Sequence, residues 1–271
     1  MKLTRRVTFS AGHRFWMANL SPEENRQIFG PWASPFNHGH NYILDVTTQG
    51  EVDPKTGMVI NIKEIDEVLQ RDIVSQFAQR SMNDEIPHFA SVTPCLENLL
   101  LYLRTELLGL PQQVTLTHIR LEETPTIWAD LNVITNKMTF SRSYEFAAAH
   151  RLHCAELSDE KNAELFGKCN NAAGHGHNYV LEVSVTGTPD PQTGFIIDMS
   201  ELDASVNRNI LERYDHKNLN VDLPEFEGRM TTTETLAQEI WKRLDGAVPG
   251  QLERICIHET ARSRFEVCRG D

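Results

Sequence analysis

The sequence contains no long apolar run and no cluster of basic residues. No stretch approaches the roughly 20 consecutive apolar residues that a membrane-spanning helix needs. The formal net charge of the 271 residues is −12, and no basic patch of the kind that binds nucleic acid stands out. We therefore expect neither a membrane nor a nucleic acid as partner. A small anionic substrate stays possible, because a metal ion with Lys or Arg can make a local site positive.

Cysteine is scarce and irregularly placed. The five cysteines form an odd set without the regular spacing of a disulfide framework. The basic start of the chain resembles a signal peptide, but Thr8, Ser10 and His13 interrupt the apolar core that such a peptide requires. These features predict a cytoplasmic protein with reduced thiols. The cysteines are Cys95, Cys154, Cys169, Cys256 and Cys268.

An internal repeat divides the chain. The pentapeptide His-Gly-His-Asn-Tyr occurs at 38–42 and again at 175–179, an offset of 137 residues. The same offset relates His13 to His150 and Asp53-Pro54 to Asp190-Pro191. A period of this length is too long for a solenoid repeat, so each copy should be a domain of its own. We predict one domain over residues 1–136 and a second over residues 137–271.

Both copies show the same order of elements. Alternating apolar and polar residues predict strands at 3–13 and 40–50, and a helical stripe of apolar residues starts at Lys63. A second helix is indicated at 95–108, followed by two closing strands. The order ββααββ recurs in the second copy. We therefore predict the α+β class, with an antiparallel sheet in each copy and helices on one face.

Three histidines in each copy have the spacing of a metal site. His175 and His177 lie two residues apart at the start of a strand, so their imidazoles point to the same face. His150 ends another strand and supplies a third imidazole. Three histidines without a fourth protein ligand are typical of a catalytic zinc site, which keeps one position open. A lone His-x-His pair is usually unremarkable, but the equivalent set recurs in the first copy as His13, His38 and His40.

The two copies differ in their other reactive groups. Cys169 corresponds to Trp32, and the pair Asp215-His216 corresponds to Ala78-Gln79. A single cysteine is more often a small buried apolar residue, and Asp215-His216 alone could be a helix cap. Read together, these groups predict a catalytic second copy and a degenerate first copy that keeps its metal histidines.

The second copy closely resembles the 6-pyruvoyl-tetrahydropterin synthase family over nearly all of residues 140–270. The resemblance implies a tunnelling fold, in which three units form a barrel, two barrels stack, and active sites lie between units. It also implies a homo-oligomer, for which a trimer of tandem chains supplies the six units. The matching motifs are EFAAAHRL, LFGKCNNAAGHGHNY, DPQTGFIID, YDHKNLN, TTTETLA and HET in the second copy, and TFSAGHRF, HGHNY, DPKTGMVIN and LEET in the first.

The resemblance also assigns roles to residues. His150, His175 and His177 would hold Zn²⁺, and Cys169 would be the catalytic base. Asp215 and His216 would relay protons, while Glu259 would anchor the pterin ring with Thr232 nearby. In the first copy, Glu123 would match Glu259 only after a shift of one residue.

The implied reaction converts 7,8-dihydroneopterin triphosphate to 6-pyruvoyltetrahydropterin and triphosphate, which makes the protein a zinc-dependent carbon-oxygen lyase. One alternative is 6-carboxytetrahydropterin synthase of the queuosine route, which releases acetaldehyde. The five residues between Cys169 and His175 favour the pyruvoyl type. A second alternative is a non-catalytic scaffold that binds a pterin or a metal.

Overall fold

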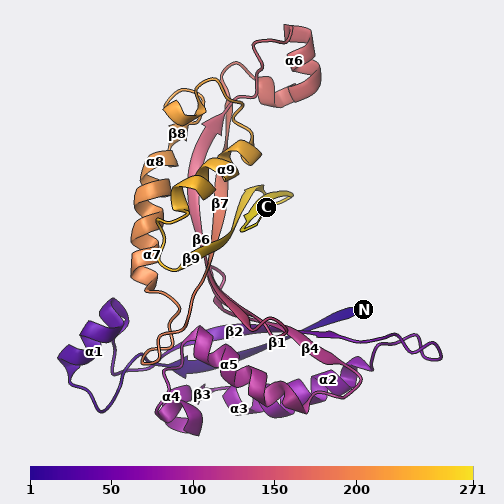
Figure 1. Ribbon diagram of the computed structural model, residues 1–271, viewed down its shortest axis with the longest axis vertical. Coiled ribbons are helices and arrows are strands. Elements are labelled where there is room, and N and C mark those ends of the chain that lie inside the picture. Colours follow the sequence, from indigo (N-terminus) through magenta and orange to yellow (C-terminus); the bar gives the residue numbers. More distant parts are fainter. Residues whose placement is uncertain (271) are drawn as a thin grey trace. The chain divides into compact units, whose positions relative to one another are not determined.

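The structure is a computed structural model that describes residues 1–270, and it contains two compact units (Figure 1). Unit 1 consists of Met1–Ser141 together with the loop Thr186–Ile196. Unit 2 consists of Arg142–Val185 and the chain from Ile197 onward. The division therefore falls close to the middle of the chain, but it also assigns one loop of the second repeat to unit 1. No helix among the described residues is long and apolar enough to span a membrane.

Unit 1 contains an antiparallel sheet with the strand order β3-β1-β2-β4-β5, in which only the short β3 runs parallel to its neighbour β1. Helix α5 packs against β4 and β5, and Figure 1 shows α2, α3 and α5 on the same side of this sheet. The elements are β1 (Lys2–His13), α1 (Pro22–Phe29), η1 (Gly30–Trp32), β2 (His38–Gln49), α2 (Ile62–Val68), η2 (Leu69–Val74), α3 (Ser75–Phe77), β3 (Arg80–Ser81), α4 (Met82–Glu85), η3 (Pro87–Ala90), α5 (Leu96–Glu106), η4 (Leu107–Gly109), β4 (Thr115–Thr124) and β5 (Ile127–Asn132).

Unit 2 repeats this arrangement. Its strands follow the order β10-β9-β7-β6, the short β8 runs parallel to β6, and α9 packs against β9 and β10. The first residues of β6 belong to unit 1. The elements are β6 (Lys137–His150), α6 (Asp159–Phe166), η5 (Gly167–Asn170), β7 (His175–Thr186), α7 (Met199–Val206), η6 (Asn207–Leu211), α8 (Glu212–Tyr214), β8 (Lys217–Asn218), η7 (Pro224–Phe226), α9 (Thr233–Leu244), β9 (Gln251–Thr260) and β10 (Ser263–Cys268).

The core of each unit follows from the alternation in its strands. Every second residue near the end of β1 is buried, so Phe9 and His13 point to the same inner face. Phe9 stacks on Tyr42 with ring centroids 5.3 Å apart, and in unit 2 Phe146 stacks on Tyr179 at 5.2 Å. The α+β class and the antiparallel sheet with helices on one face are confirmed. In each unit, the histidines therefore lie at the ends of two neighbouring strands.

The first long helix of each unit contains a π-helical turn. It runs from α2 through η2 to α3 in unit 1, and from α7 through η6 to α8 in unit 2. Asn61 and Asp198 cap these helices, each accepting a hydrogen bond from the backbone two residues later. Turns of this kind are rare and often lie near functional sites. Here the helix of unit 2 ends immediately before Asp215 and His216.

Two short helices that the sequence did not predict precede the histidine strands. Helices α1 and α6 begin after Ser21 and Ser158, whose hydroxyls accept hydrogen bonds from the backbone at Glu24 and Lys161. In the first case Glu24 returns a bond to the Ser21 N–H and completes a capping box. Each helix leads into a short 3-10 turn, and the turn after α6 contains Cys169.

Candidate active site and metal centre

Three histidines of unit 2 converge at the ends of β6 and β7. One nitrogen from each of His150, His175 and His177 lies within 4.8 Å of the others, and the Nε2 atoms of His150 and His175 are 3.1 Å apart. The His150 Nδ1 lies 2.8 Å from the Thr231 carbonyl, which fixes the proton on Nδ1 and leaves Nε2 as an acceptor. Burial lowers the pKa of all three imidazoles, so they are held in the neutral form that binds metal. This donor set fits a metal ion.

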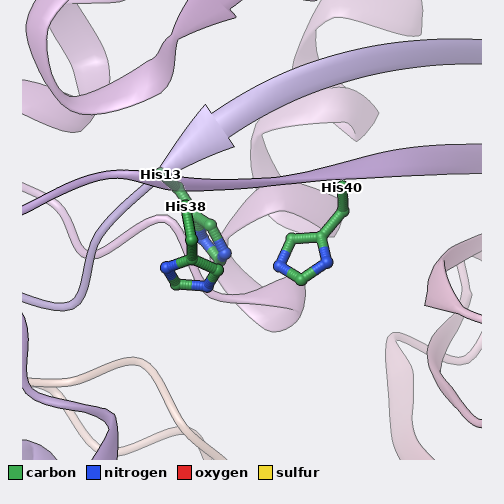
Figure 2. Close-up of side chains that lie close together, drawn as sticks. All are labelled: His13, His38 and His40. Carbon is green, nitrogen blue, oxygen red and sulfur yellow. The ribbon is translucent and has the colours of Figure 1, made fainter.

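Unit 1 repeats the same geometry (Figure 2). His13, His38 and His40 turn their rings toward one another, with centroids 4.5, 5.1 and 5.0 Å apart, against 4.6, 5.2 and 4.9 Å in unit 2. The His13 Nδ1 lies 2.9 Å from the Pro94 carbonyl. Burial lowers the pKa of His13 to about 3 and that of His40 to about 4. The Nε2 atoms of these two residues are buried without a hydrogen-bond partner, as expected for atoms that face a cation.

A carboxylate lies beside each histidine set. Glu259 Oε1 is 3.9 Å from the Nε2 atoms of both His150 and His177 and accepts a 2.6 Å hydrogen bond from the Thr233 hydroxyl. The carboxylate therefore stands at the edge of the metal site, where one oxygen stays available to a ligand.

Glu123 takes the same place in unit 1. It lies 3.9 Å from His13 Nε2 and 3.7 Å from His40 Nε2, and burial raises its pKa to about 7. The one-residue shift in the sequence has a simple origin. Strand β4 begins 19 residues after the start of α5, whereas β9 begins 18 residues after the start of α9. The extra residue lies in the connection, so the spatial equivalence of Glu123 and Glu259 is kept.

Cys169 lies half-buried in the turn after α6, and its carbonyl accepts a 2.9 Å hydrogen bond from Leu152 N–H. Burial raises the pKa of the Tyr179 hydroxyl, and the negative charge of Glu259 acts in the same direction. The backbone bond to Leu152 places the turn that carries Cys169 two residues beyond His150, at the end of β6. The equivalent Trp32 ends η1 in unit 1 with 39% of its surface exposed.

Asp215 and His216 form a hydrogen-bonded pair at the end of the long helix. Asp215 is the C-cap, and its Oδ1 accepts a 2.8 Å bond from Ala147 N–H, which holds the pKa of this carboxyl below its usual value. Asp215 Oδ2 lies 2.9 Å from His216 Nδ1. The His216 side chain is 82% exposed and lines a groove of about 660 Å³ together with His177. The pair thus borders a groove that one of the three metal histidines also lines.

Direct contacts do not join all three members of the predicted triad, Cys169, Asp215 and His216. Within residues 1–270, no hydrogen bond or ion pair joins Cys169 to Asp215 or to His216. The structure therefore joins Asp215 to His216 and places His216 and His177 along one groove, while the turn with Cys169 is bonded to Leu152 beyond the end of β6.

Three consecutive threonines at the start of α9 make different hydrogen bonds. Thr232 caps the helix, since its hydroxyl accepts a 3.3 Å bond from Thr235 N–H. The next residue, Thr233, holds Glu259, and the preceding Thr231 holds His150 through its carbonyl. Sequence reasoning singled out Thr232 and missed Thr231 and Thr233. The signal was available, because a run of three threonines just before a helix offers several hydroxyls and carbonyls to one site.

Comparison with known proteins defines the class of enzyme. The family model described as 6-pyruvoyl tetrahydropterin synthase matches the chain twice, over residues 2–133 and 139–269. The chain belongs to this family, as a tandem pair of its units, and is thus a tetrahydropterin synthase by class. The resemblance inferred from the motifs and the expected tunnelling-fold units are confirmed.

Individual relatives match about half of the chain. The 6-pyruvoyl tetrahydrobiopterin synthase of Poecilia reticulata is 46% identical over 132 residues, which are 48% of this chain and 89% of that protein. The human protein of the same name is 45% identical over 44% of this chain and 83% of its own length. A 6-carboxy-5,6,7,8-tetrahydropterin synthase of Rickettsia conorii is 26% identical over 48% of this chain and 99% of its length. The solved structure of the Caenorhabditis elegans 6-pyruvoyl tetrahydropterin synthase is 39% identical, with a TM-score of 0.46, over 48% of this chain and 94% of that one.

Proposed function

We propose that unit 2 is a zinc-dependent lyase that converts 7,8-dihydroneopterin triphosphate to 6-pyruvoyltetrahydropterin and triphosphate. One observation carries this proposal. The histidine set and its carboxylate occur in both units, but Cys169 and the Asp215–His216 pair occur only in unit 2. The groups that exchange protons are therefore kept in one copy and replaced in the other.

His150, His175 and His177 would hold the Zn²⁺, with a position left for the substrate. The ion would polarise the hydroxyl oxygens of the pterin side chain and so acidify the adjacent C–H bonds. Glu259 would accept hydrogen bonds from the N–H groups of the amino-pyrimidinone edge, because such a planar edge presents two donors side by side. The Thr233 hydroxyl orients this carboxylate through its 2.6 Å bond.

Cys169 would act as the base that removes a proton from the side chain of the pterin, since a thiolate is stabilised beside a cation. Asp215 holds His216 Nδ1, so the free Nε2 can give or take a proton in the groove that it shares with His177. The oxidation of one side-chain carbinol to a ketone is balanced by reduction of the C=N bond of the dihydropterin ring, and elimination of triphosphate converts the second carbinol to a ketone that carries a methyl group. The reaction needs no nicotinamide or flavin.

The first copy of the repeat, residues 1–136, is proposed as a degenerate domain that keeps a metal site at His13, His38 and His40 without turnover. The second copy, residues 137–271, is proposed as the catalytic domain. We also propose a cytoplasmic homo-oligomer, with a trimer of tandem chains as the favoured state, because the family resemblance implies an assembly of six units.

A second candidate is 6-carboxytetrahydropterin synthase activity, because a relative of that name matches 48% of the chain. The identity is lower than for the pyruvoyl-type relatives, which reach 46%.

The deciding experiment incubates the zinc-loaded protein with 7,8-dihydroneopterin triphosphate and identifies the product by mass. We expect 6-pyruvoyltetrahydropterin. A 6-carboxy product with acetaldehyde would establish the second candidate instead. No turnover by folded protein with bound zinc would overturn both and leave a binding scaffold.

A further inference from the structure

A third group of metal-ligating side chains lies in unit 2, apart from the two histidine sets. Glu182 of β7 and Cys256 and His258 of the neighbouring β9, here called the thiol cluster, each offer one ligand atom, and these atoms all lie within 4.8 Å of one another. Because His258 precedes Glu259 on an extended strand, their side chains point to opposite faces of the sheet. The thiol cluster therefore lies on the face away from the histidine set of unit 2.

The distances within the thiol cluster fit a tetrahedral metal site. Zn–S bonds of about 2.3 Å and Zn–N bonds of about 2.0–2.1 Å place sulfur and nitrogen about 3.6 Å apart at a tetrahedral angle. The Cys256 sulfur lies 3.6 Å from His258 Nε2. Glu182 Oε1 lies 3.0 Å from the same nitrogen, against roughly 3.4 Å for two ligands of one zinc ion. A small rotation of the Glu182 side chain would correct this difference.

A single imidazole proton cannot serve both contacts of His258. A neutral Nε2 either donates to the Glu182 carboxylate or accepts from the Cys256 thiol, and it cannot do both. The thiol is 0% exposed, and burial raises its pKa to about 12, so it carries a proton when no metal is bound. A divalent cation would accept an electron pair from all three groups. The thiol proton would then leave to solvent, and the imidazole proton would move to Nδ1.

Arg254 holds the carboxylate of the thiol cluster in place. Its guanidinium donates to Glu182 Oε2 at 2.9 Å and to Glu266 Oε1 at 2.8 Å, which leaves Glu182 Oε1 directed at His258. Ligating carboxylates are commonly fixed by such an outer hydrogen bond. Glu266 lies directly opposite Cys256 in the pairing of β9 with β10. A divalent cation, a thiolate, two carboxylates and one guanidinium sum to zero charge, so binding would leave no charge uncompensated.

Unit 1 has a different set of side chains at the same places. Positions 182, 256 and 258 correspond to Asp45, Arg120 and Glu122, with the same one-residue shift in the later strand that relates Glu123 to Glu259. Arg120 lies directly opposite Asp45 in the pairing of β2 with β4, and Arg6 donates two 2.7 Å bonds to the Asp45 carboxylate. Unit 1 thus pairs its carboxylate with arginine, whereas unit 2 surrounds it with a thiol and an imidazole. The donor set belongs to the second copy and not to the fold.

We propose that Glu182, Cys256 and His258 bind a divalent cation of the zinc type and so form a third metal site, which joins β7 to β9. Thiolate and imidazole ligands select such ions over Mg²⁺ or Ca²⁺. The histidine sets bind metal without losing a thiol proton, so the thiol cluster fills after them. The cation ties the strand that carries His177 to the strand that carries Glu259, and its binding does not depend on the proposed reaction.

The first test adds Co²⁺ to the zinc-loaded chain and records the near-ultraviolet absorption. A thiolate bound to Co²⁺ gives a charge-transfer band that imidazole and carboxylate ligands do not give, so the band reports the thiol cluster even if Co²⁺ also enters a histidine set. Cys256→Ala should abolish the band. Cys268→Ala is the matched control, because Cys268 lies on β10 opposite Arg254 and outside the cluster, and it should keep the band.

Cys169→Ala should also keep the band, which separates the thiol cluster from the thiol of the proposed active site. No band in the wild-type chain, a band that survives in folded Cys256→Ala, or a band that requires Cys169 instead would overturn the proposal.

The second test measures the melting temperature of the zinc-loaded chain with and without added Cd²⁺, a soft cation that prefers thiolate ligands. Binding to the folded state should raise the melting temperature. Glu182→Gln should reduce this rise, whereas the equivalent change in the first copy, Asp45→Asn, should leave it as in wild type. Equal rises in the two variants would overturn the proposed site. Circular dichroism without added metal checks that each variant is folded, and neither test requires turnover.

Discussion

Gln79 and His216 share the same left-handed backbone conformation, with φ angles of 63° and 57°, just beyond the ends of the two equivalent long helices. Each N–H donates to a strand carbonyl, Gln79 to Ser10 at 2.7 Å and His216 to Ala147 at 2.6 Å. Non-glycine residues seldom adopt positive φ angles, and they do so where the surroundings hold them. The first unit has therefore kept the backbone of the site after losing its imidazole.

This relationship makes His216→Gln a clean probe of proton transfer. The chain itself shows that glutamine fits the conformation, so the melting temperature should stay within about 2 °C of wild type, which corresponds to less than 1 kcal/mol. Because an amide cannot exchange the proton, kcat should fall by about 10²–10⁴-fold. The reverse change, Gln79→His, should leave activity unaltered. Full activity of His216→Gln would show that this imidazole takes no part in turnover.

Cys169→Ala should abolish turnover while the metal stays bound. The thiol is the proposed base but not a metal ligand, so kcat should drop by about 10³-fold or more and the zinc content should not change. Cys154→Ala is the control, because Cys154 is likewise a partly exposed free cysteine of the same unit. Retention of wild-type kcat by Cys169→Ala would refute the assigned base.

The two histidine sets should bind two metal ions per chain, which elemental analysis can count. His38→Ala and His175→Ala should each lower the content to one, because each removes a ligand from a different set. Activity should be lost only in His175→Ala. A single ion in the wild-type chain would show that the geometry of unit 1 is not sufficient for binding.

Glu225 should make stability depend on acid. Burial acts to raise its pKa, but the side chains of Arg213 and Arg243, whose nitrogens lie 2.6 and 2.8 Å from Glu225 Oε1, hold it at about 2. The folded pKa lies below the usual 4.5, so the contribution is complete above pH 4.5 and is lost as the pH falls toward 2.

Glu225→Gln should therefore lower the free energy of unfolding by about 2 kcal/mol at pH 7, as measured by urea denaturation. The difference from wild type should shrink as the pH drops below 4.5. The exposed Glu227→Gln serves as the control and should change little at either pH. A difference that does not vary with pH would mean that Glu225 acts by packing and not by charge.

Much of the site could be predicted because its residues lie on regular strands. The period of two puts His175 and His177 on one face, and the internal repeat shows which neighbours recur. The roles of residues in loops and at helix starts were harder to predict from the sequence. Thr232 and Thr233 are adjacent in the sequence. Only the residue at which the helix starts decides which hydroxyl caps the helix and which one donates to Glu259.

The helices α1 and α6 were missed because each has only eight residues, too few to show a clear apolar stripe. The contact between Ile196 and Glu97 was also beyond reach, because the two residues are 99 positions apart and no local pattern links them. Glu123 was difficult for a third reason, since one extra residue in a connection breaks the register of the repeat.

The hydrogen bond from Ile196 N–H to Glu97 joins two residues of unit 1 that lie 99 positions apart in the chain. Because the bond is intramolecular, its occupancy does not change with protein concentration. It also means that unit 1 is not complete when residue 141 has been synthesised. The buried carboxyl group of Glu97 receives its donor only after the loop Thr186–Ile196 has left the ribosome.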